Sequence, residues 1–298
     1  MKPETQKTAG KNQSAYSDNL LLDGLAALLL VGLVVWASVW LGQHTGTGNI
    51  TTLFVFVAAG ITALTTGFGA LPFLFTRNIG KSWLGYGNAL AAGLMLGASI
   101  GLLIEGAFIG DVSQPLLRTL AGAITGAVLV VAAHKMLKGR EDDLSIGSIQ
   151  GANAVKMLLI VGIMTAHSFA EGIGVGVSYG ETEAFGVFIT IAIAIHNIPE
   201  GLAISLVLLP RGSSIRGAAG WSIFSSLPQP LMAVPAFWFV LTFKLFLPFG
   251  LGLAAGAMLW MVARELLPEA LEETPAPIVY GLMVLMALGM IGFQLWLH

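Results

Sequence analysis

Residues 152–209 read ANAVKMLLIVGIMTAHSFAEGIGVGVSYGETEAFGVFITIAIAIHNIPEGLAISLVLL. The stretch contains two long apolar segments, 152–178 and 184–209, joined by a short polar connection. A helix needs about 20 predominantly apolar residues to cross the hydrocarbon core of a bilayer, and each segment is long enough. Because the connection is so short, the two helices must run antiparallel. The stretch therefore predicts a membrane-spanning helical hairpin.

Similar apolar segments occupy most of the remaining chain. They lie near 20–42, 50–76, 86–109, 115–137, 217–243, 248–270 and 276–297. Of all residues 56% are apolar and 10% are charged, whereas soluble globular proteins carry about 25% charged residues. We therefore predict an all-α, polytopic transmembrane helical bundle with nine spans, embedded in a lipid bilayer. A polar tail is expected at 1–19 and a single transmembrane domain at 20–298.

The distribution of basic residues predicts the orientation of this bundle. If the N-terminal tail is cytoplasmic, 12 of the 14 lysines and arginines fall on the cytoplasmic side, and only Arg118 and Lys244 lie outside. Such an excess is typical of cytoplasmic loops. With nine spans, the C-terminus then lies outside the cytoplasm. The net charge of −2 favours no nucleic-acid partner, and the absence of cysteine excludes disulfides and thiolate metal sites.

Two similar motifs stand at the middle of the hairpin's helices. The first is His167-Ser-Phe-Ala-Glu171-Gly, and the second is His196-Asn-Ile-Pro-Glu200-Gly. Residues four apart lie on one face of a helix, so each histidine lies one turn from its glutamate. Two antiparallel helices that carry such pairs at equal depth can bring four side chains to one point. Polar interruptions at corresponding positions of paired spans are typical of a binding site at the membrane midplane.

Energetics favours a metal ion at this point. An ionised side chain at the bilayer centre costs about 3 kcal/mol or more, and two carboxylates at one depth repel each other. A divalent cation neutralises both carboxylates. Imidazole suits zinc, iron and nickel, and added carboxylates extend the range towards manganese. The alternative is that both pairs only hold the bundle together by interhelical hydrogen bonds, and the repetition of the motif favours the metal site.

Prolines and one further acidic residue mark other candidate positions. The segment 217–243 contains Pro228, Pro230 and Pro235, so we expect a broken helix with Gln229 beside a pathway. Pro199 leaves a carbonyl free beside the second motif and is expected to let that helix bend. Glu265 either pairs with a neighbouring helix or lines an exit pathway on the inner side.

These residues resemble the ZIP family of divalent metal transporters, and the resemblance is closest to its bacterial and GufA-type members. It covers the chain from about residue 51 to the end. The matching stretches are AAGLMLGASIGLL at 91–103, HSFAEGIGVGVS at 167–178, AIHNIPEGLAISL at 194–206, SSLPQPLMA at 225–233 and GLAAGAMLWMVARELLPE at 252–269. The family has eight core helices, so the first span resembles the additional N-terminal helix of some bacterial members.

The resemblance implies a binuclear-type transport site between the fourth and fifth core helices, with ligands for two metal ions. The first metal site would use His167, Glu171, His196 and Glu200, with Met95 as a neighbour. The family's second site falls on Ser168, Asn197 and Gln229, where this chain has weaker or uncharged groups. The sequence therefore predicts one complete metal site beside the remnant of a second.

The resemblance also implies a function. We expect a transporter of Zn²⁺, with Fe²⁺, Mn²⁺, Co²⁺ or Cd²⁺ as further substrates, that moves metal towards the cytoplasm across a bacterial inner membrane by an elevator-like motion. No catalytic residue and no cofactor are expected. The chain contains 38 glycines, which permit close helix packing within one subunit or between two. The sequence therefore does not decide between a monomer and a homodimer.

Three alternatives use the same site. A metal-selective channel and a metal sensor would need the same ligands, and the sequence does not separate them from a carrier. An intramembrane metalloprotease would need a histidine-glutamate-x-x-histidine motif. The chain has Ser168 after the first histidine and a glutamate at position 171, so we predict that it is not an enzyme.

Overall fold

The computed structural model of the chain describes residues 5–46, 50–76, 81–110, 112–138, 152–209 and 213–297. Every regular element within these residues is a helix, which confirms the predicted all-α class. In chain order the elements are α1 (Thr5–His44), α2 (Thr52–Thr66), the 3-10 helix η1 (Gly67–Leu74), α3 (Lys81–Phe108), α4 (Pro115–Lys138), α5 (Ala152–Glu181), α6 (Glu183–Leu208), α7 (Ile215–Ser226), α8 (Pro228–Thr242), the 3-10 helix η3 (Lys244–Phe246), α9 (Leu247–Met261), the π-helix η4 (Val262–Leu266), α10 (Leu267–Glu273) and α11 (Ala276–Leu297).

Most of the predicted spans are present as long apolar helices. Eight helical segments of the described chain are long and apolar enough to cross a membrane, and they match eight of the nine predicted spans. The remaining predicted span is α5, a 30-residue helix that packs against α6, α8 and α9. Large apolar side chains such as Leu29, Trp36 and Trp296 are more than half exposed, as contact with lipid requires. The chain is therefore a multi-pass membrane protein.

By their contacts the helices form two bundles that pack against each other. The first bundle consists of α2, α5, α6, α7 and α8, and the second bundle consists of α3, α4, α9, α10 and α11. Contact between the bundles runs mainly through α3 with α6 and through α5 with α9. Both hairpin helices predicted to carry the site, α5 and α6, therefore belong to the first bundle.

Glycines bring backbones together within a bundle but not at the α5–α9 contact. A Cβ atom on Gly126 of α4 would meet the main chain of α9, and one on Gly256 of α9 would meet the main chain of α4. Small residues of this kind allow membrane helices to approach closely. Between the bundles, Gly174 of α5 faces the Cβ atom of Ala254 on α9 instead. The α4–α9 pair is thus in contact backbone to backbone, while at Gly174 the main chain of α5 meets the methyl group of Ala254 on α9.

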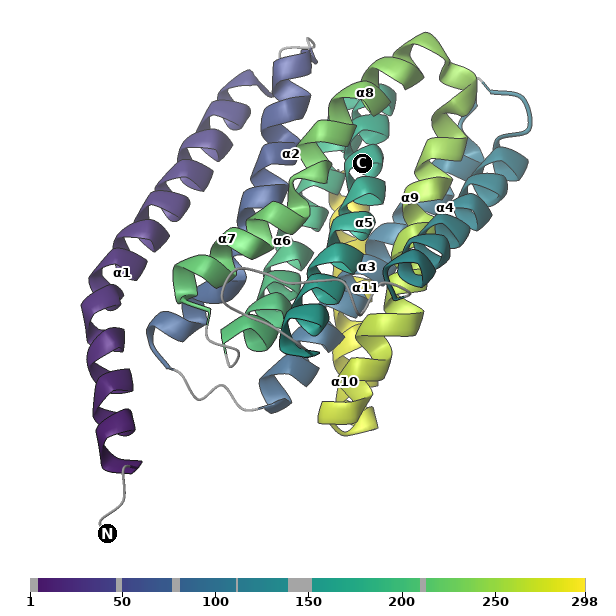
Figure 1. Cartoon of the computed structure of the whole chain (residues 1–298). Coiled ribbons are helices and arrows are strands. Elements are labelled where there is room, and N and C mark those ends of the chain that lie inside the picture. Colours follow the sequence, from purple (N-terminus) through teal and green to yellow (C-terminus); the bar gives the residue numbers. More distant parts are fainter. Residues whose placement is uncertain are drawn as a thin grey trace.

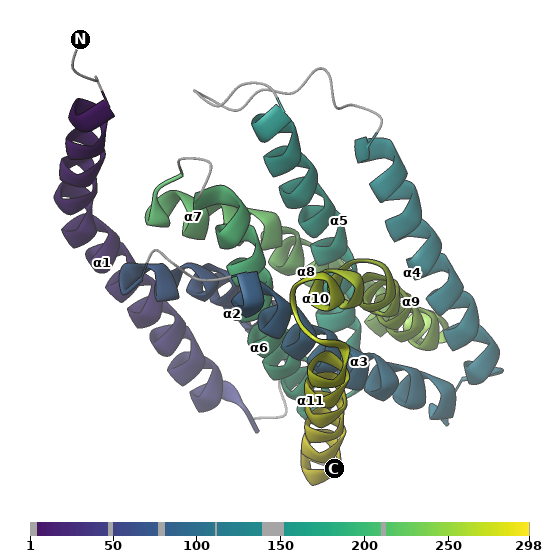
Figure 2. The ribbon, with the colours of Figure 1, turned by 90° about the horizontal axis from the view of Figure 1, so that it is seen from below.

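Helix α1 lies on the flank of the molecule, beside α2 and α7 (Figures 1 and 2). Asp23 of α1 is buried, and its carboxylate lies 2.6 Å from Nε of Arg216 on α7. The helix begins at Thr5, so it continues through most of the segment predicted as a polar tail. Residues 1–4 lie outside the described chain, and the cytoplasmic position of the tail stays a prediction.

The prolines of the seventh span and of α6 have different effects, and α8 continues through Pro235. The seventh span breaks at Leu227 into α7 and α8, with Pro228 at the start of α8, as the proline cluster predicted. Helix α6, by contrast, continues through Pro199 from Glu183 to Leu208. The π-helix η4, which carries Glu265, was not predicted from the sequence. Both the break at Leu227 and the π-helix interrupt regular helix within spans that pack against α5.

Candidate metal centre

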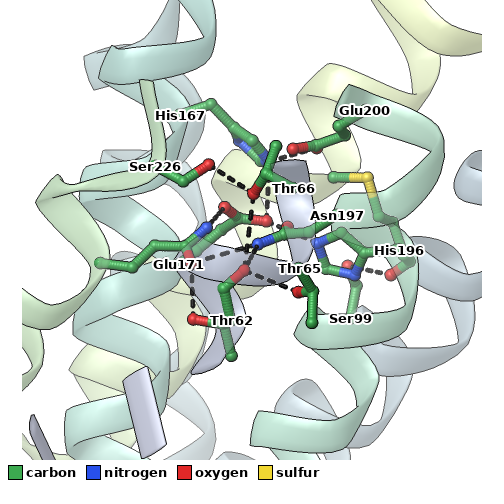
Figure 3. Close-up of polar contacts among 12 residues, drawn as sticks. Thr62, Thr65, Thr66, Ser99, His167, Glu171, His196, Asn197, Glu200 and Ser226 are labelled. Carbon is green, nitrogen blue, oxygen red and sulfur yellow. Dashed lines mark hydrogen bonds and ion pairs between the residues drawn. The ribbon is translucent and has the colours of Figure 1, made fainter. Parts of the chain in front are cut away.

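The two predicted motifs meet where α5 and α6 pack against each other (Figure 3). His167 and Glu171 stand at the middle of α5, and His196 and Glu200 stand at the middle of α6. Their side chains are at most 2% exposed. We refer to these four residues as the four-residue site. Their helical spacing and the antiparallel hairpin bring them together as expected, and their role as metal ligands stays a prediction.

Glu171 lies between the two imidazoles. Its Oε1 atom is 2.5 Å from Nε2 of His196 and 3.2 Å from Nε2 of His167. Nε2 of His167 is also 3.5 Å from Oε1 of Glu200. Ligand atoms of His167, Glu171 and Glu200 all lie within 4.8 Å of one another, as a shared metal ion would require. His196 lies outside this group of three and joins it only through Oε1 of Glu171.

Several buried atoms of this cluster lack a hydrogen bond. Within the described chain these are both ring nitrogens of His167, Nδ1 of His196 and Oε1 of Glu200. Buried polar atoms are nearly always hydrogen-bonded, so unsatisfied ones need an explanation. Imidazole nitrogens and carboxylate oxygens are the donors that zinc and similar divalent ions prefer. The chemistry of these atoms therefore fits a metal ion.

Two amides lie beside the four-residue site, where the family's second site was expected. Gln229 of α8 donates from Nε2 to Oε2 of Glu171 over 2.6 Å. Its Oε1 accepts from Nδ2 of Asn197 over 3.1 Å. Both side chains are fully buried. The two amides are therefore bonded to each other and to the site's central carboxylate.

A threonine of α2 completes this network and was not predicted. The hydroxyl of Thr62 lies 2.5 Å from Oε1 of Gln229, and its main-chain carbonyl accepts from Asn197 over 2.7 Å (Figure 3). The segment TALTT at 62–66 places three threonines at helical spacing in an apolar span. This polar face is the signal that could have indicated a contribution from α2.

The glycine after each motif glutamate explains how these helices come so close. A Cβ atom on Gly172 would meet the main chain of Gln229, and one on Gly201 would meet the carbonyl of Thr66. Any larger residue would push α8 away from α5 or α2 away from α6. The last residue of each motif therefore admits the helix that carries the site's hydrogen-bonding partners.

The other predicted residues lie around the site. Met95 is fully buried on α3, and Ser168 is buried on α5 directly after His167. Glu265 on η4 is partly buried and near enough to His167 and Glu200 to interact with them electrostatically. Metal contact by Met95 or Ser168, and an exit pathway at Glu265, stay predictions.

Comparison with known proteins gives consistent matches. The family model described as ZIP zinc transporter matches residues 132–295. The chain is 45% identical to the candidate zinc transporter At3g08650 of Arabidopsis thaliana over 78% of its own length, but it spans only 37% of that protein. It is 29% identical to the zinc transporter GufA of Myxococcus xanthus over 72% of this chain and 87% of that protein. It is 30% identical to the zinc transporter ZIPB of Bordetella bronchiseptica over 90% of this chain and 87% of that protein.

Proposed function

The chain belongs to the ZIP zinc transporter family, and from this premise we propose that it carries Zn²⁺ across a membrane through the four-residue site. Family membership and relatives named as zinc transporters make it a divalent metal transporter. The observation that carries the finer proposal is the buried cluster in which His167, Glu171 and Glu200 place ligand atoms within 4.8 Å of one another. Transport, rather than catalysis, is the function of the named relatives.

The ligand set suits Zn²⁺. Zinc binds four protein ligands in a tetrahedral arrangement at about 2.0–2.2 Å for nitrogen and oxygen. Two such ligands lie less than about 4.4 Å apart, because each is within 2.2 Å of the ion. The observed separations of 3.2 and 3.5 Å from Nε2 of His167 meet that limit. Fe²⁺, Mn²⁺, Co²⁺ and Cd²⁺ are further substrates, while the absence of sulfur from the four-residue site disfavours copper(I).

We also propose that one ion binds at a time. Glu171 uses Oε2 to accept from Gln229, so only Oε1 is left to face the imidazoles. In the second site that the family would place here, the amides of Asn197 and Gln229 bring no negative charge. A second divalent ion would therefore find no additional carboxylates to neutralise its charge. This supports one complete site beside a remnant.

The division into two bundles supports a carrier over a channel. All four ligands and the hydrogen-bonding partners Thr62 and Gln229 belong to the first bundle. At Gly174 the main chain of this bundle faces the methyl group of Ala254 on the second bundle, not the main chain of α9. A bundle that holds the whole site can slide against its neighbour and expose the ion to each side in turn. In this proposal the motion delivers metal to the cytoplasm of a bacterial cell through its inner membrane.

Uptake by purified protein in liposomes tests the proposal. Wild-type protein should accumulate Zn²⁺, and His167→Ala should abolish accumulation because it removes a nitrogen ligand. His44→Ala is the matched control, since His44 is an exposed histidine outside the site. If the wild type takes up none of the named ions, or if His167→Ala behaves like His44→Ala, the proposal fails.

Counterflow separates the carrier from a channel or a sensor. A carrier loaded with unlabelled Zn²⁺ on one side should take up labelled Zn²⁺ faster from the other, because the loaded site returns more readily. A channel gives flux without such stimulation, and a sensor gives binding without flux. Either of these results would replace the carrier with the corresponding alternative.

A further inference from the structure

The side-chain amide of Gln229 is held in one orientation. Its Nε2 donates to Oε2 of Glu171, while its Oε1 accepts from Nδ2 of Asn197. Turning the amide over would place its oxygen against the carboxylate of Glu171 and its nitrogen against that of Asn197. An amide nitrogen cannot accept a hydrogen bond and an ionised carboxylate cannot donate one. The network around Gln229 therefore permits only the observed orientation.

Thr62 contacts both amides. Its hydroxyl lies 2.5 Å from Oε1 of Gln229 and 2.7 Å from the carbonyl of Ala59, so its single proton faces two acceptors. Its own carbonyl accepts from Nδ2 of Asn197 over 2.7 Å. The side chain is fully buried, so water does not compete for these contacts. Thr62 of α2 is thus hydrogen-bonded to both Asn197 and Gln229 (Figure 3).

We propose that Thr62 is a positioning residue that sets the metal preference of the four-residue site through Gln229. The inference rests on the proposed function, because it concerns the ions that this same site binds. With its amide held by Thr62, Gln229 occupies Oε2 of Glu171 and leaves Oε1 for the ion. Glu171 then serves as a ligand through one oxygen.

Binding through one oxygen favours a small coordination number. Zinc is usually coordinated by four ligands, whereas larger or harder ions such as Mn²⁺ bind more oxygen ligands. Without the Thr62 hydroxyl, Oε1 of Gln229 keeps only the hydrogen bond from Asn197, so the amide turns away from Glu171 more readily. The second carboxylate oxygen and the amide oxygen then become available to the ion. Loss of this hydroxyl should therefore shift the preference from Zn²⁺ towards Mn²⁺.

The test compares the affinities for Zn²⁺ and Mn²⁺ in purified full-length protein. Thr62→Val removes the hydroxyl and keeps the side-chain shape, and Thr62→Ser retains the hydroxyl. Thr119→Val is the control, because Thr119 is an equally buried threonine on α4 whose hydroxyl donates to the carbonyl of Pro115. The free energy of one hydrogen bond, converted to affinity, predicts about a 3- to 10-fold fall in the Zn²⁺-to-Mn²⁺ preference of Thr62→Val. Thr62→Ser and Thr119→Val should keep the wild-type ratio.

A double mutant separates positioning from general packing. If Thr62 acts through Gln229, adding Thr62→Val to Gln229→Leu should leave the Zn²⁺-to-Mn²⁺ affinity ratio at the value of Gln229→Leu. The amide through which Thr62 would act is already absent from that variant. An unchanged ratio in Thr62→Val, an equal change in Thr119→Val, or full additivity with Gln229→Leu would overturn the proposal. Wild-type protein that binds neither ion would instead overturn the proposed function.

Discussion

Gln229 donates a hydrogen bond of 2.6 Å to Glu171, and this bond joins the broken seventh span to the first motif. The break at Leu227 lets α8 begin with Pro228, directly before the glutamine. Gly172 follows Glu171 on α5 and leaves room for the main chain of α8 at this point. An uncharged side chain thereby reaches the central carboxylate of the buried four-residue site.

Replacing Glu171 with glutamine should nearly eliminate transport. The substitution keeps the shape of the side chain but removes the charge of the oxygen that lies between the two imidazoles. Because loss of an outer-shell partner already lowers metal affinity about 10- to 100-fold, loss of a direct ligand should exceed 10-fold. Isothermal titration with Zn²⁺ measures the effect. Affinity within about threefold of the wild type would remove Glu171 from the ligand set.

Restoring acidic residues should create a second metal site. In Gln229→Glu with Asn197→Asp, two carboxylates replace the two amides beside Glu171, and they would repel each other without a cation. Elemental analysis of purified protein should then give two zinc ions per chain instead of one. Gln229→Met with Asn197→Leu is the matched control and should not gain an ion. A ratio that stays at one in the acidic variant contradicts the remnant interpretation.

A methyl group at Gly201 should damage both the fold and the site. The new Cβ would meet the carbonyl of Thr66, so α2 and α6 would have to separate. Overpacking of this kind costs about 1–3 kcal/mol. The thermal midpoint of Gly201→Ala should fall and Zn²⁺ uptake should fall with it. Gly60→Ala on α2 is the control, because a Cβ there meets nothing within 4 Å and alanine favours a helix.

Linking the two bundles should stop transport reversibly. The chain has no cysteine, so a pair introduced as Gly174→Cys and Ala254→Cys would be the only thiols. A Cβ on Gly174 would lie 2.9 Å from the Cβ of Ala254, so the two helices must move apart by about 0.6 Å to reach the shortest disulfide separation of about 3.5 Å. Oxidation should abolish Zn²⁺ uptake, and reduction of the same sample should restore it. Uptake that persists after complete oxidation would argue against sliding bundles.

The sequence was sufficient to predict the helices and the meeting of the two motifs, because both depend on local spacing. Apolar length identifies a span, and a four-residue spacing places His167 beside Glu171 and His196 beside Glu200 whatever surrounds them. The proline cluster likewise predicted the break before Gln229. These features depend on local backbone geometry, which the chain specifies residue by residue.

Other features depend on which helices become neighbours, and the sequence does not show this. Thr62 is an ordinary residue of an apolar helix until α2 packs against α6 and α8. Its carbonyl, which holds Asn197, belongs to the backbone and leaves no trace in the residue types. The π-helix η4 was equally hidden, because one extra residue in a turn changes no composition.

The ion pair between Asp23 and Arg216 has a consequence for the surrounding membrane. It fastens α1 to α7, so a sliding first bundle must drag α1 with it. Only 17% of the residues in the apolar window of α1 are buried in the protein, so most of this window is open to lipid. Each transport cycle would then displace acyl chains along the whole flank. A more viscous or thicker bilayer would then slow the transport cycle.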